Sequence, residues 1–537
     1  MAVKVGAILL DTRSIQKYVF GSNKLKTNTG ASYLVDGIFN EAMVAVLQAS
    51  GFKMPKESWE KTKSLCMESD AAIEAEIAYI GGGNMLVLVR KGENPLELCR
   101  ELVRKWSLKV LINAPGLKTG AAIGELSLGK DEFQASLNKL YAQLKENQNN
   151  ILPQVDLPYT GFTVECDYSG KAANIFSKEY QRLISAEVEA KTRAYPYAVN
   201  KNKADYAASL GDKYEFCSEL ESIGYKDGES YVSVIHIDGN NMGVKFSSCR
   251  SMSERKALSL KVKKTVQNAF EYLVNKIITE YSSYDSVLDM RKLQQGGKLL
   301  LPLRPIIIGG DDITFICPGR MGLQYAKLFI EYVNSEDLLD NDLYKHIKSV
   351  TGKTINQSMS CCAGVAIVPA KYPFFRAYEL AEQLCDEAKT LSRADDGNYL
   401  DFAVLHGEKY GDIDLLRKEQ YMTNVGKLHY GPYNVLGSSK DKHSLQALLA
   451  LTAKLSDKAM PHNKVKELRR VLHEGRHEMS IFLENCPEIQ RLVQQESGQA
   501  VVNADSLWEQ EKESVTRYID AIELMDFVYP QKGTEVK

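Results

Sequence analysis

Three aspartates in the second half of the sequence could bind a divalent cation together. Asp311 and Asp312 follow two glycines in the segment IIGGDD, and Asp238 ends the apolar segment VIHID. Carboxylates that lie close together repel each other, so such a cluster is unfavourable unless a cation lies among them. Ligands that are all oxygen, without histidine or cysteine, favour Mg²⁺ or Mn²⁺. Two such ions, about 3.5–4 Å apart, would suit phosphoryl or nucleotidyl transfer.

The residues beside these aspartates suit contact with a nucleotide. Gly309 and Gly310 have no side chains, so the backbone there can approach a nucleotide closely. Gly239 directly follows Asp238 and could offer its carbonyl oxygen to a metal ion. His236 and Asp238 point to the same face of a strand. His236 could therefore support the carboxylates, or it could be a histidine packed within the sheet, and the sequence leaves both open.

Periodic patterns predict the elements that must position these residues. In the second half we expect a strand, a long helix, a hairpin, a strand and a helix, at residues 231–237, 253–281, 304–317, 360–368 and 377–393. In the first half we expect a strand, a helix, a pair of strands, a helix and a strand, at residues 2–10, 31–48, 75–90, 95–106 and 120–126. After about residue 426 only helical patterns follow, and we expect helices at 445–455, 463–484 and 506–527.

The two halves of the first 415 residues form an internal repeat. Each begins with a strand that ends in an aspartate, Asp11 in AILLDTRS and Asp238 in VIHIDGNN. From this aspartate to the first hairpin glycine the spacing is 81 − 11 = 70 residues in one copy and 309 − 238 = 71 residues in the other. In the first copy Gly83 and Asn84 replace the paired acids of the second, so the first copy can hardly hold two metal ions.

The order β-α-β-β-α-β in each copy is that of the ferredoxin-like fold. We therefore predict an α+β protein in which two ferredoxin-like (palm) domains pack as a pseudo-dimer and an all-α domain follows. Two unrelated α+β domains with similar hairpins are the alternative. The expected boundaries are 1–150 for a degenerate first palm, 151–228 for an insert or linker of mixed helix and loop, 229–415 for the second palm with GGDD, and 416–537 for the helical domain.

The composition indicates an ordinary globular protein and excludes several classes. The 537 residues include 67 basic and 69 acidic side chains, so no global positive field would attract nucleic acid. No apolar run approaches the roughly 18 residues of a membrane-spanning helix, and the segment MAVKVGAILLDT lacks the features of a signal peptide. The ten cysteines contain no CxxC pair, which favours reduced thiols in a cytoplasmic protein.

Several segments resemble the palm-type polymerase–cyclase large subunit of type III CRISPR effector complexes. The similarity lies in IDGNNMG (237–243), in IIGGDD (307–312), in SCCAGVAIVPAKYPFFRAYELAEQLCDEAK (360–389) and, in the first copy, in LDTRSIQKYVFGSNKL. It covers roughly residues 1–430. The resemblance implies a stand-alone or complex-bound enzyme that uses ATP with two Mg²⁺ or Mn²⁺ ions to make cyclic oligoadenylate messengers.

The resemblance also implies roles for individual residues. It makes Asp238, Asp311 and Asp312 the catalytic metal ligands, with Gly239 as a further metal-binding residue. It implies a nucleotide pocket in which Lys389 holds the triphosphate, since a lysine ammonium on a helix suits that task. The remaining residues that we expect to contact the nucleotide are Gly239, Asn240, Gly309 and Gly310.

The sequence departs from this family in several places. It starts directly at the first palm without an HD nuclease segment, so we expect no DNA cleavage by this chain. The segment CDYSGKAA, where the family often has a zinc-binding insert, contains only Cys166, and Cys217 lies far off, so a zinc site is doubtful. Asn240 stands where an acid is common in the family. Ile313 follows GGDD in place of the EF ending, and this argues against a diguanylate cyclase. Partners could be the subunits of an RNA-guided effector, or the chain could work alone as a homodimer.

Three other patterns have simpler interpretations. HEGRH (473–477) matches the zinc-protease pattern, but we expect its histidines to face solvent, away from the apolar stripe of their helix. TGKT (351–354) lacks the upstream glycine of a P-loop and is expected to be a turn. Lys24 and Lys26, with Arg13, lie in a polar loop of the first copy, where they could be solvated or could contact phosphate.

We therefore expect an enzyme of antiviral signalling, a metal-dependent nucleotidyltransferase that converts ATP into a cyclic oligonucleotide and releases pyrophosphate. The alternative is a non-catalytic scaffold or sensor that binds ATP without turnover and docks partner proteins. The acids that are clustered in one copy favour the enzyme, because a scaffold has no need of them.

Overall fold

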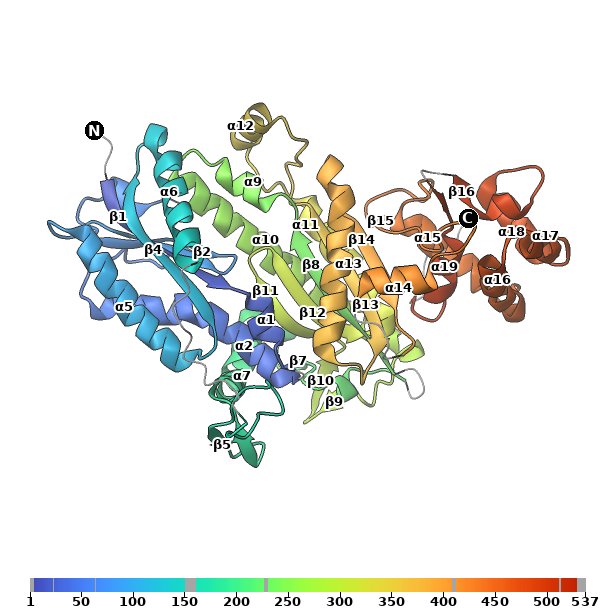
Figure 1. Cartoon of the computed structure of the whole chain (residues 1–537), viewed down its shortest axis with the longest axis horizontal. Coiled ribbons are helices and arrows are strands. Elements are labelled where there is room, and N and C mark those ends of the chain that lie inside the picture. Colours follow the sequence, from blue (N-terminus) through green and yellow to red (C-terminus); the bar gives the residue numbers. More distant parts are fainter. Residues whose placement is uncertain are drawn as a thin grey trace.

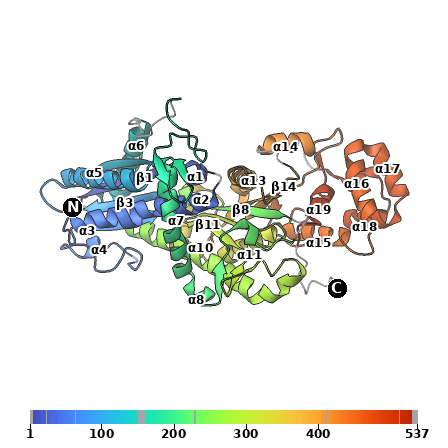
Figure 2. The ribbon, with the colours of Figure 1, turned by 90° about the horizontal axis from the view of Figure 1, so that it is seen from below.

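Three parts lie in a row along the long axis of the chain (Figure 1). The computed structural model describes residues 4–22, 24–62, 64–149, 161–226, 230–407, 412–510 and 513–528. A four-stranded sheet with its helices occupies one end, a six-stranded sheet lies in the middle, and a mostly helical part occupies the other end. Figure 2 shows the same succession from below. No described helix combines the length and the apolar composition that a bilayer-spanning segment requires.

The first sheet has the strand order β2-β3-β1-β4, with antiparallel neighbours throughout. Its strands are β1 (Lys4–Arg13), β2 (Ala75–Gly81), β3 (Asn84–Val89) and β4 (Lys118–Ser127). Residues 5–10 of β1 are all buried, as expected for a central strand. The helices of this part are α1 (Ile15–Phe20), α2 (Leu25–Gly37), a π-helical segment (Ile38–Met43), α3 (Val44–Ala49), α4 (Cys66–Ser69), α5 (Pro95–Asn113) and α6 (Lys130–Asn149).

The second sheet has the strand order β11-β12-β8-β13-β14-β15. Its strands are β8 (Tyr231–Gly239), β11 (Arg304–Gly309), β12 (Asp312–Pro318), β13 (Cys361–Pro369), β14 (Tyr399–Val404) and β15 (Tyr433–Asn434). Only the β13–β14 pair is parallel among the strand pairs described for this sheet. The helices of this part are α9 (Met242–Ser247), α10 (Met252–Glu280), η3 (Tyr281–Ser286), η4 (Gly319–Met321), α11 (Gly322–Ser335), α12 (Asn341–Thr351) and α13 (Phe374–Asp395).

The two sheets confirm the predicted duplication and the predicted α+β class. Strands β2-β3-β1-β4 correspond in order and direction to β11-β12-β8-β13. The outer strand of each hairpin also has a β-bulge at the same distance before its hairpin glycine, at Ala78 before Gly81 and at Ile306 before Gly309. A bulge is a local feature that chance would not place twice in register. Both halves are therefore ferredoxin-like palms built by duplication.

The two palms pack on each other through reciprocal contacts, as the predicted pseudo-dimer requires. Helix α10 packs against β2, and the corresponding helix α2 packs against β11. A buried ion pair joins the palms, because Nζ of Lys256 on α10 lies 3.0 Å from Oε1 of Glu76 on β2. Phe20 of α1 stacks on Tyr378 of α13, with ring centroids 3.6 Å apart. Contacts that repeat in both directions are those of an approximate twofold axis.

An insert follows the first palm and lies beneath both palms in the view of Figure 1. Its described elements are β5 (Ile175–Ser177), β6 (Arg182–Ile184), α7 (Ala186–Asp205), α8 (Ala207–Leu210), β7 (Tyr214–Phe216) and η2 (Leu220–Ser222). Strand β7 joins β9 (Gln294–Gln295) and β10 (Lys298–Leu301) in a sheet of order β7-β10-β9. Helix α7 packs closely along α2, since a Cβ on Gly30 would lie 1.9 Å from the carbonyl oxygen of Lys191.

Lys24 and Lys26 face this insert, and the predicted polar loop ends at Lys24 instead of including Lys26. Helix α2 already begins at Leu25, because the α2 residues that follow are buried against α7. Nζ of Lys24 lies 5.5 Å from the ring centroid of Tyr168, and Nζ of Lys26 lies 3.5 Å from Oε1 of Glu219. Both lysines therefore serve the contact between α2 and the insert, which gives no support to phosphate binding by them.

The C-terminal part differs from the predicted helices in two places. Its elements are α14 (Ile413–Gln420), α15 (Leu445–Leu455), α16 (His462–Glu474), α17 (Arg476–Glu484), α18 (Pro487–Ser497), η5 (Ala504–Leu507), β16 (Glu509–Gln510), β17 (Ser514–Val515) and α19 (Tyr518–Leu524). The helix predicted at 463–484 is broken at Gly475, whose φ of 143° and ψ of 174° are not helical. The helix predicted at 506–527 is reduced to α19, because the hairpin β16–β17 pairs the preceding backbone. His473 and His477 thus lie on different helices, so HEGRH does not form the single-helix zinc-protease site.

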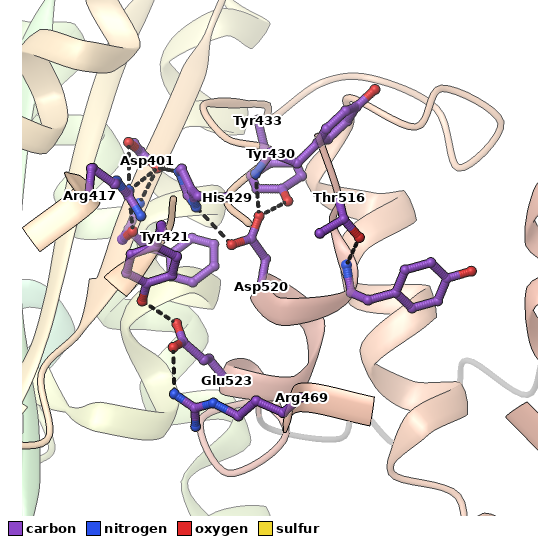
Figure 3. Close-up of polar contacts among 12 residues, drawn as sticks. Asp401, Arg417, Tyr421, His429, Tyr430, Tyr433, Arg469, Thr516, Asp520 and Glu523 are labelled. Carbon is purple, nitrogen blue, oxygen red and sulfur yellow. Dashed lines mark hydrogen bonds and ion pairs between the residues drawn. The ribbon is translucent and has the colours of Figure 1, made fainter. Parts of the chain in front are cut away.

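A buried polar network joins the second palm to the C-terminal part (Figure 3). Nε2 of His429 lies 2.8 Å from Oδ1 of Asp401 on β14, and Nδ1 lies 2.7 Å from Oδ1 of Asp520 on α19. Burial and the charge of Arg417 on α14 lower the pKa of His429, but the two carboxylates outweigh them and raise it to about 9. Because both ring nitrogens face carboxylates, His429 is held as an imidazolium.

This network should make the protein less stable at alkaline pH. The pKa of His429 is about 9 in the folded chain and about 6.5 when unfolded. Its contribution is therefore fully present below about pH 6.5 and is lost as the pH rises through 9, a change of about 3 kcal/mol. We expect His429→Gln to be most destabilising at pH 6.5 and much less so at pH 10, as measured by urea unfolding. A difference between wild type and variant that does not change with pH would contradict this.

Candidate functional site

The structure brings the three predicted acids to one end of the second sheet. Strand β12 pairs with β8 in a register that places Asp312 directly opposite Asp238. Asp311 lies in the turn between β11 and β12, and its carbonyl oxygen accepts a hydrogen bond of 3.1 Å from the N–H of Gly239. A side chain at Gly239 would not fit, because its Cβ would lie 2.9 Å from the Cβ of Asp311. Residues separated by more than seventy positions thus form one acidic cluster.

The carboxyl groups of the hairpin lie in surroundings that disfavour their charge. Burial raises the pKa of Asp311 to about 7, and the charge of Asp238 acts in the same direction. Burial and Asp238 also raise the pKa of Asp312 to about 7. A cation placed beside these groups would restore their ionised forms. The electrostatics of the cluster therefore fit a divalent ion.

Lys389 on α13 is the cationic partner of this cluster. Its Nζ donates a hydrogen bond to Oδ2 of Asp238. Burial lowers the pKa of Lys389, but the carboxylate of Asp238 outweighs burial and raises it. The charged ammonium thus occupies an oxygen that a metal ion would also use. Its predicted contact with a triphosphate stays a prediction, and its position beside the acids is compatible with it.

His236 lies behind Asp312 within the sheet. Its Nδ1 is 3.2 Å from Oγ1 of Thr314 and 3.3 Å from Oδ1 of Asp312. Burial lowers the pKa of His236, which favours the neutral ring. Oδ1 of Asp312 is buried and accepts no hydrogen bond, and such an atom costs free energy unless a donor or a cation reaches it. His236 is therefore a packed strand histidine that also adjoins the acidic cluster.

The described residues do not yet form a complete set of metal ligands. Among them, no three carboxylate, imidazole or thiol groups are grouped closely enough to hold one ion. Oδ2 of Asp238 accepts the hydrogen bond from Lys389 instead, and Oδ1 of Asp312 lies 3.3 Å from Nδ1 of His236. Release of Asp238 from Lys389 would free the oxygen that the cluster needs. The donor chemistry fits Mg²⁺ or Mn²⁺, and the metal site stays a prediction.

The residues predicted to contact a nucleotide lie in different surroundings. Gly309 borders open space, since no atom lies within 4 Å of a Cβ placed on it. Gly310 has a φ of 63°, and a Cβ on it would lie 3.1 Å from the backbone N of Gly82, at the tip of the corresponding hairpin of the first palm. Asn240 is buried, and its Nδ2 donates a hydrogen bond of 2.9 Å to the carbonyl oxygen of Gly397. Of these three positions, Gly309 alone leaves room for a ligand.

The contact between the two hairpin tips predicts different effects of the same substitution at neighbouring glycines. Gly310→Ala should destabilise the protein by roughly 1–2 kcal/mol, because the left-handed backbone disfavours a Cβ and the methyl group meets Gly82. Gly309→Ala is the matched control and should unfold like the wild type, since its methyl group enters open space. Thermal unfolding without nucleotide checks this, and equal stability of the two variants would contradict it.

The first palm keeps the geometry of the cluster but not its charges. Asn84 lies opposite Asp11 in the register that places Asp312 opposite Asp238 in the second palm. Nε2 of Gln148 donates a hydrogen bond of 2.6 Å to Oδ2 of Asp11. Gln148 comes near the end of α6, the helix that follows the fourth strand, as Lys389 does near the end of α13. Asn84 thus stands where the second palm has Asp312, and Gln148 stands where it has Lys389. With neutral amides at both positions, the first palm has less negative charge with which to bind a cation.

Other candidates from the sequence lie away from the cluster. Cys166 is buried against Ile184 and Val188 in the insert, and Sγ of Cys217 lies 2.8 Å from the carbonyl oxygen of Glu219. One cavity of about 360 Å³ lies at the opposite end of β8 from the acids, among Tyr225, Tyr231, Arg320, His406, Asp526 and Phe527. Neither feature adds a group to the acidic cluster.

Two charged residues beside the cluster were not predicted. Lys245 on α9 and Asp396, directly after α13, have no exposed surface, and Nζ of one lies 3.8 Å from Oδ2 of the other. The local sequence carries no signal for this pair, because lysine and aspartate are usually exposed unless tertiary contacts bury them together.

Comparison with known proteins confirms the resemblance seen in the sequence. Residues 231–396 match the sequence profile of the second palm domain of Cas10/Cmr2, and no curated protein matches the chain. Csm1 of T. onnurineus has a TM-score of 0.52 at 13% identity, over 98% of this chain and 70% of that chain. Csm1 in the Csm1–Csm4 cassette with cA3 gives the same values. In the cassette with cA4 the match covers 75% of this chain but only 54% of that chain, at 13% identity and a TM-score of 0.42. At 13% identity, the two matches with a TM-score of 0.52 show a shared fold.

Proposed function

We propose that this chain, whose residues 231–396 match the second palm domain of Cas10/Cmr2, is a metal-dependent nucleotidyltransferase that converts ATP into a cyclic oligonucleotide and releases pyrophosphate. The observation that carries the proposal is the register that sets Asp312 opposite Asp238 with Asp311 in the adjoining turn. A cluster of partly buried acids in only one of two duplicated domains is typical of a catalytic cation site.

In the proposed reaction the 3′-hydroxyl oxygen of one ATP forms a bond to the α-phosphorus of the next. The bond from that phosphorus to pyrophosphate breaks, and the hydroxyl proton passes to water. Asp238, Asp311 and Asp312 would hold Mg²⁺ or Mn²⁺, and the ion would supply the charge that lowers the pKa of the hydroxyl and stabilises the leaving pyrophosphate. The ammonium of Lys389 would leave Asp238 and bind oxygens of the triphosphate. Gly309 leaves space for the nucleotide.

The partners of this chain are part of the same proposal. Solved structures of Csm1 show it in a cassette with Csm4 and with ligands such as cA3 and ATP. We expect this chain to act in CRISPR-type signalling, either with an effector subunit or alone as a homodimer. Size-exclusion chromatography with light scattering separates a homodimer from a monomer that awaits a partner.

A direct assay tests the proposed activity. The protein is incubated with ATP and Mn²⁺, pyrophosphate is measured, and products are resolved by mass. We expect oligoadenylates with the mass of closed rings, formed together with pyrophosphate, and neither in Asp311→Ala/Asp312→Ala. Release of inorganic phosphate instead, or equal product from the double variant, would contradict the proposal.

A non-catalytic ATP sensor is the second candidate, and one observation favours it. The ammonium of Lys389 is hydrogen-bonded to Oδ2 of Asp238, and the described acids do not form a three-ligand site without rearrangement. A sensor would show an ATP-dependent rise in melting temperature without any product. The same samples used for the mass assay distinguish the two functions.

A further inference from the structure

We infer that Asp396 is a positioning residue for the proposed reaction, because it fixes the turn after Asp238 to the end of the helix that carries Lys389. The inference rests on the proposed function, since it concerns the acid and the lysine of that site. Asp396 directly follows α13 as its C-cap and is fully buried. It lies seven residues after Lys389, so its contacts fix the end of the helix on which Lys389 lies.

Both carboxylate oxygens of Asp396 accept hydrogen bonds from segments that border the acidic cluster. Oδ1 accepts one of 2.7 Å from Nδ2 of Asn241 and one of 2.8 Å from Oγ of Ser360. Oδ2 accepts one of 2.7 Å from the backbone N–H of Asn356. Asn241 follows Asp238 by three residues, and Ser360 precedes β13, the neighbour of β8. One side chain thus holds three segments together at the end of the sheet where the acids lie.

A second buried charge completes the connection from the other side. Nζ of Lys245 lies 3.8 Å from Oδ2 of Asp396 and donates a hydrogen bond of 3.2 Å to the carbonyl oxygen of Asn240. Nδ2 of Asn240 in turn donates to the carbonyl oxygen of Gly397. Two successive residues of the turn are therefore bound to two successive residues after α13, Asn240 to Gly397 and Asn241 to Asp396.

This arrangement costs free energy that simpler packing would avoid. Asn241 and Asp396 have φ values of 54° and 55°, in the left-handed region, where asparagine and aspartate are tolerated but are less favourable than glycine. A buried ion pair is often no more stable than apolar side chains of the same volume. Stability alone therefore gives no reason for this network, whereas the placement of two functional groups does.

The first palm provides an internal comparison, because it has the same turn with other residues at the positions of Asn241 and Lys245. Ser14 stands at the position of Asn241, three residues after the strand-end aspartate, and its φ of 53° is the same within a degree. Tyr18 stands at the position of Lys245, seven residues after that aspartate. There a buried lysine from α7, Lys191, donates to the carbonyl oxygen of Tyr18 instead. The pair of Lys245 within the turn and Asp396 after the helix thus belongs to the copy that has the paired acids.

Asn241→Gly tests the inference with little effect on the fold. Glycine adopts the left-handed backbone without steric cost, so only the amide that binds Asp396 is lost. We expect a melting temperature close to that of the wild type, a kcat lowered roughly 10- to 100-fold, and weaker binding of Mn²⁺ by isothermal titration calorimetry. Ser14→Gly makes the same change in the palm without paired acids and should behave like the wild type in both measurements.

Asp396→Gly removes the same connection from its other end. The double variant with Asn241→Gly should be no slower than the slower single variant, because both changes break one connection. Should Asp396→Gly fail to fold, Asn241→Gly decides alone. A wild-type chain that releases no pyrophosphate would overturn the proposed function. An active wild type together with an Asn241→Gly variant of unchanged kcat and unchanged Mn²⁺ affinity would overturn this inference only.

Discussion

Asparagine in place of Asp311 is expected to lower pyrophosphate release roughly 10²–10³-fold, while the metal-free protein becomes more stable. Activity falls because the amide has the shape of the carboxyl group but no charge for a cation. Stability rises because burial holds the pKa of Asp311 at about 7, so at pH 8 folding places a charge where it is disfavoured. The gain should be on the order of 4 kcal/mol at pH 8 and should vanish below about pH 4, where both states are protonated.

Pyrophosphate release measures the first half of this expectation, and chemical unfolding in EDTA and in Mn²⁺ measures the second. In EDTA the Asp311→Asn variant should be the more stable protein. In Mn²⁺ the wild type should gain stability by binding the ion, and the variant should gain much less. Asp11→Asn is the control in the first palm, because it makes the same Asp→Asn change at a strand-end aspartate outside the acidic cluster and should leave activity intact. A variant that keeps most of its activity, or that loses stability in EDTA, would contradict the account of this site.

Methionine in place of Lys389 is expected to change metal binding and catalysis in opposite directions. Loss of the ammonium removes one charge-assisted contact to the triphosphate, which corresponds to a roughly 10- to 100-fold loss in kcat/KM. In the free protein the same change releases Asp238, whose oxygen the ammonium now occupies. The variant should therefore bind Mn²⁺ more tightly than the wild type when no nucleotide is present.

Calorimetric titration with Mn²⁺ and steady-state kinetics with ATP give the two readings for Lys389→Met. Lys389→Arg is the control, because it keeps the positive charge and should keep weak metal binding without nucleotide. If Lys389→Met bound Mn²⁺ more weakly than the wild type, the competition between lysine and metal for Asp238 would be wrong.

The sequence predicted the fold and the meeting of the acids because both depend on short-range signals. Strand-end aspartates, glycine hairpins and equal spacing are local features, and duplication made each copy a test of the other. The register of β8 and β12 then follows from the hairpin and the sheet order, which is why Asp238 and Asp312 meet as expected. The absence of paired acids from the first palm was equally readable, at Gly83 and Asn84.

Features that depend on tertiary contacts were not predictable from such patterns. The start of α2 at Leu25 follows from packing against α7, and the break at Gly475 interrupts a continuous apolar stripe. The buried pair of Lys245 and Asp396 looks like two ordinary surface charges in the sequence. The hydrogen bond between Lys389 and Asp238 likewise depends on how α13 lies across the sheet, which no spacing rule contains.

The position of bound Mn²⁺ is the measurement that tests the central claim most directly. Crystals of the protein with Mn²⁺ and a non-hydrolysable ATP analogue would be measured at the manganese absorption edge. Anomalous density is predicted between Asp238 and the turn at 311–312, with Lys389 moved from the carboxylate to the triphosphate. Manganese bound elsewhere, or an analogue held away from this turn while Lys389 stays on Asp238, would contradict the account.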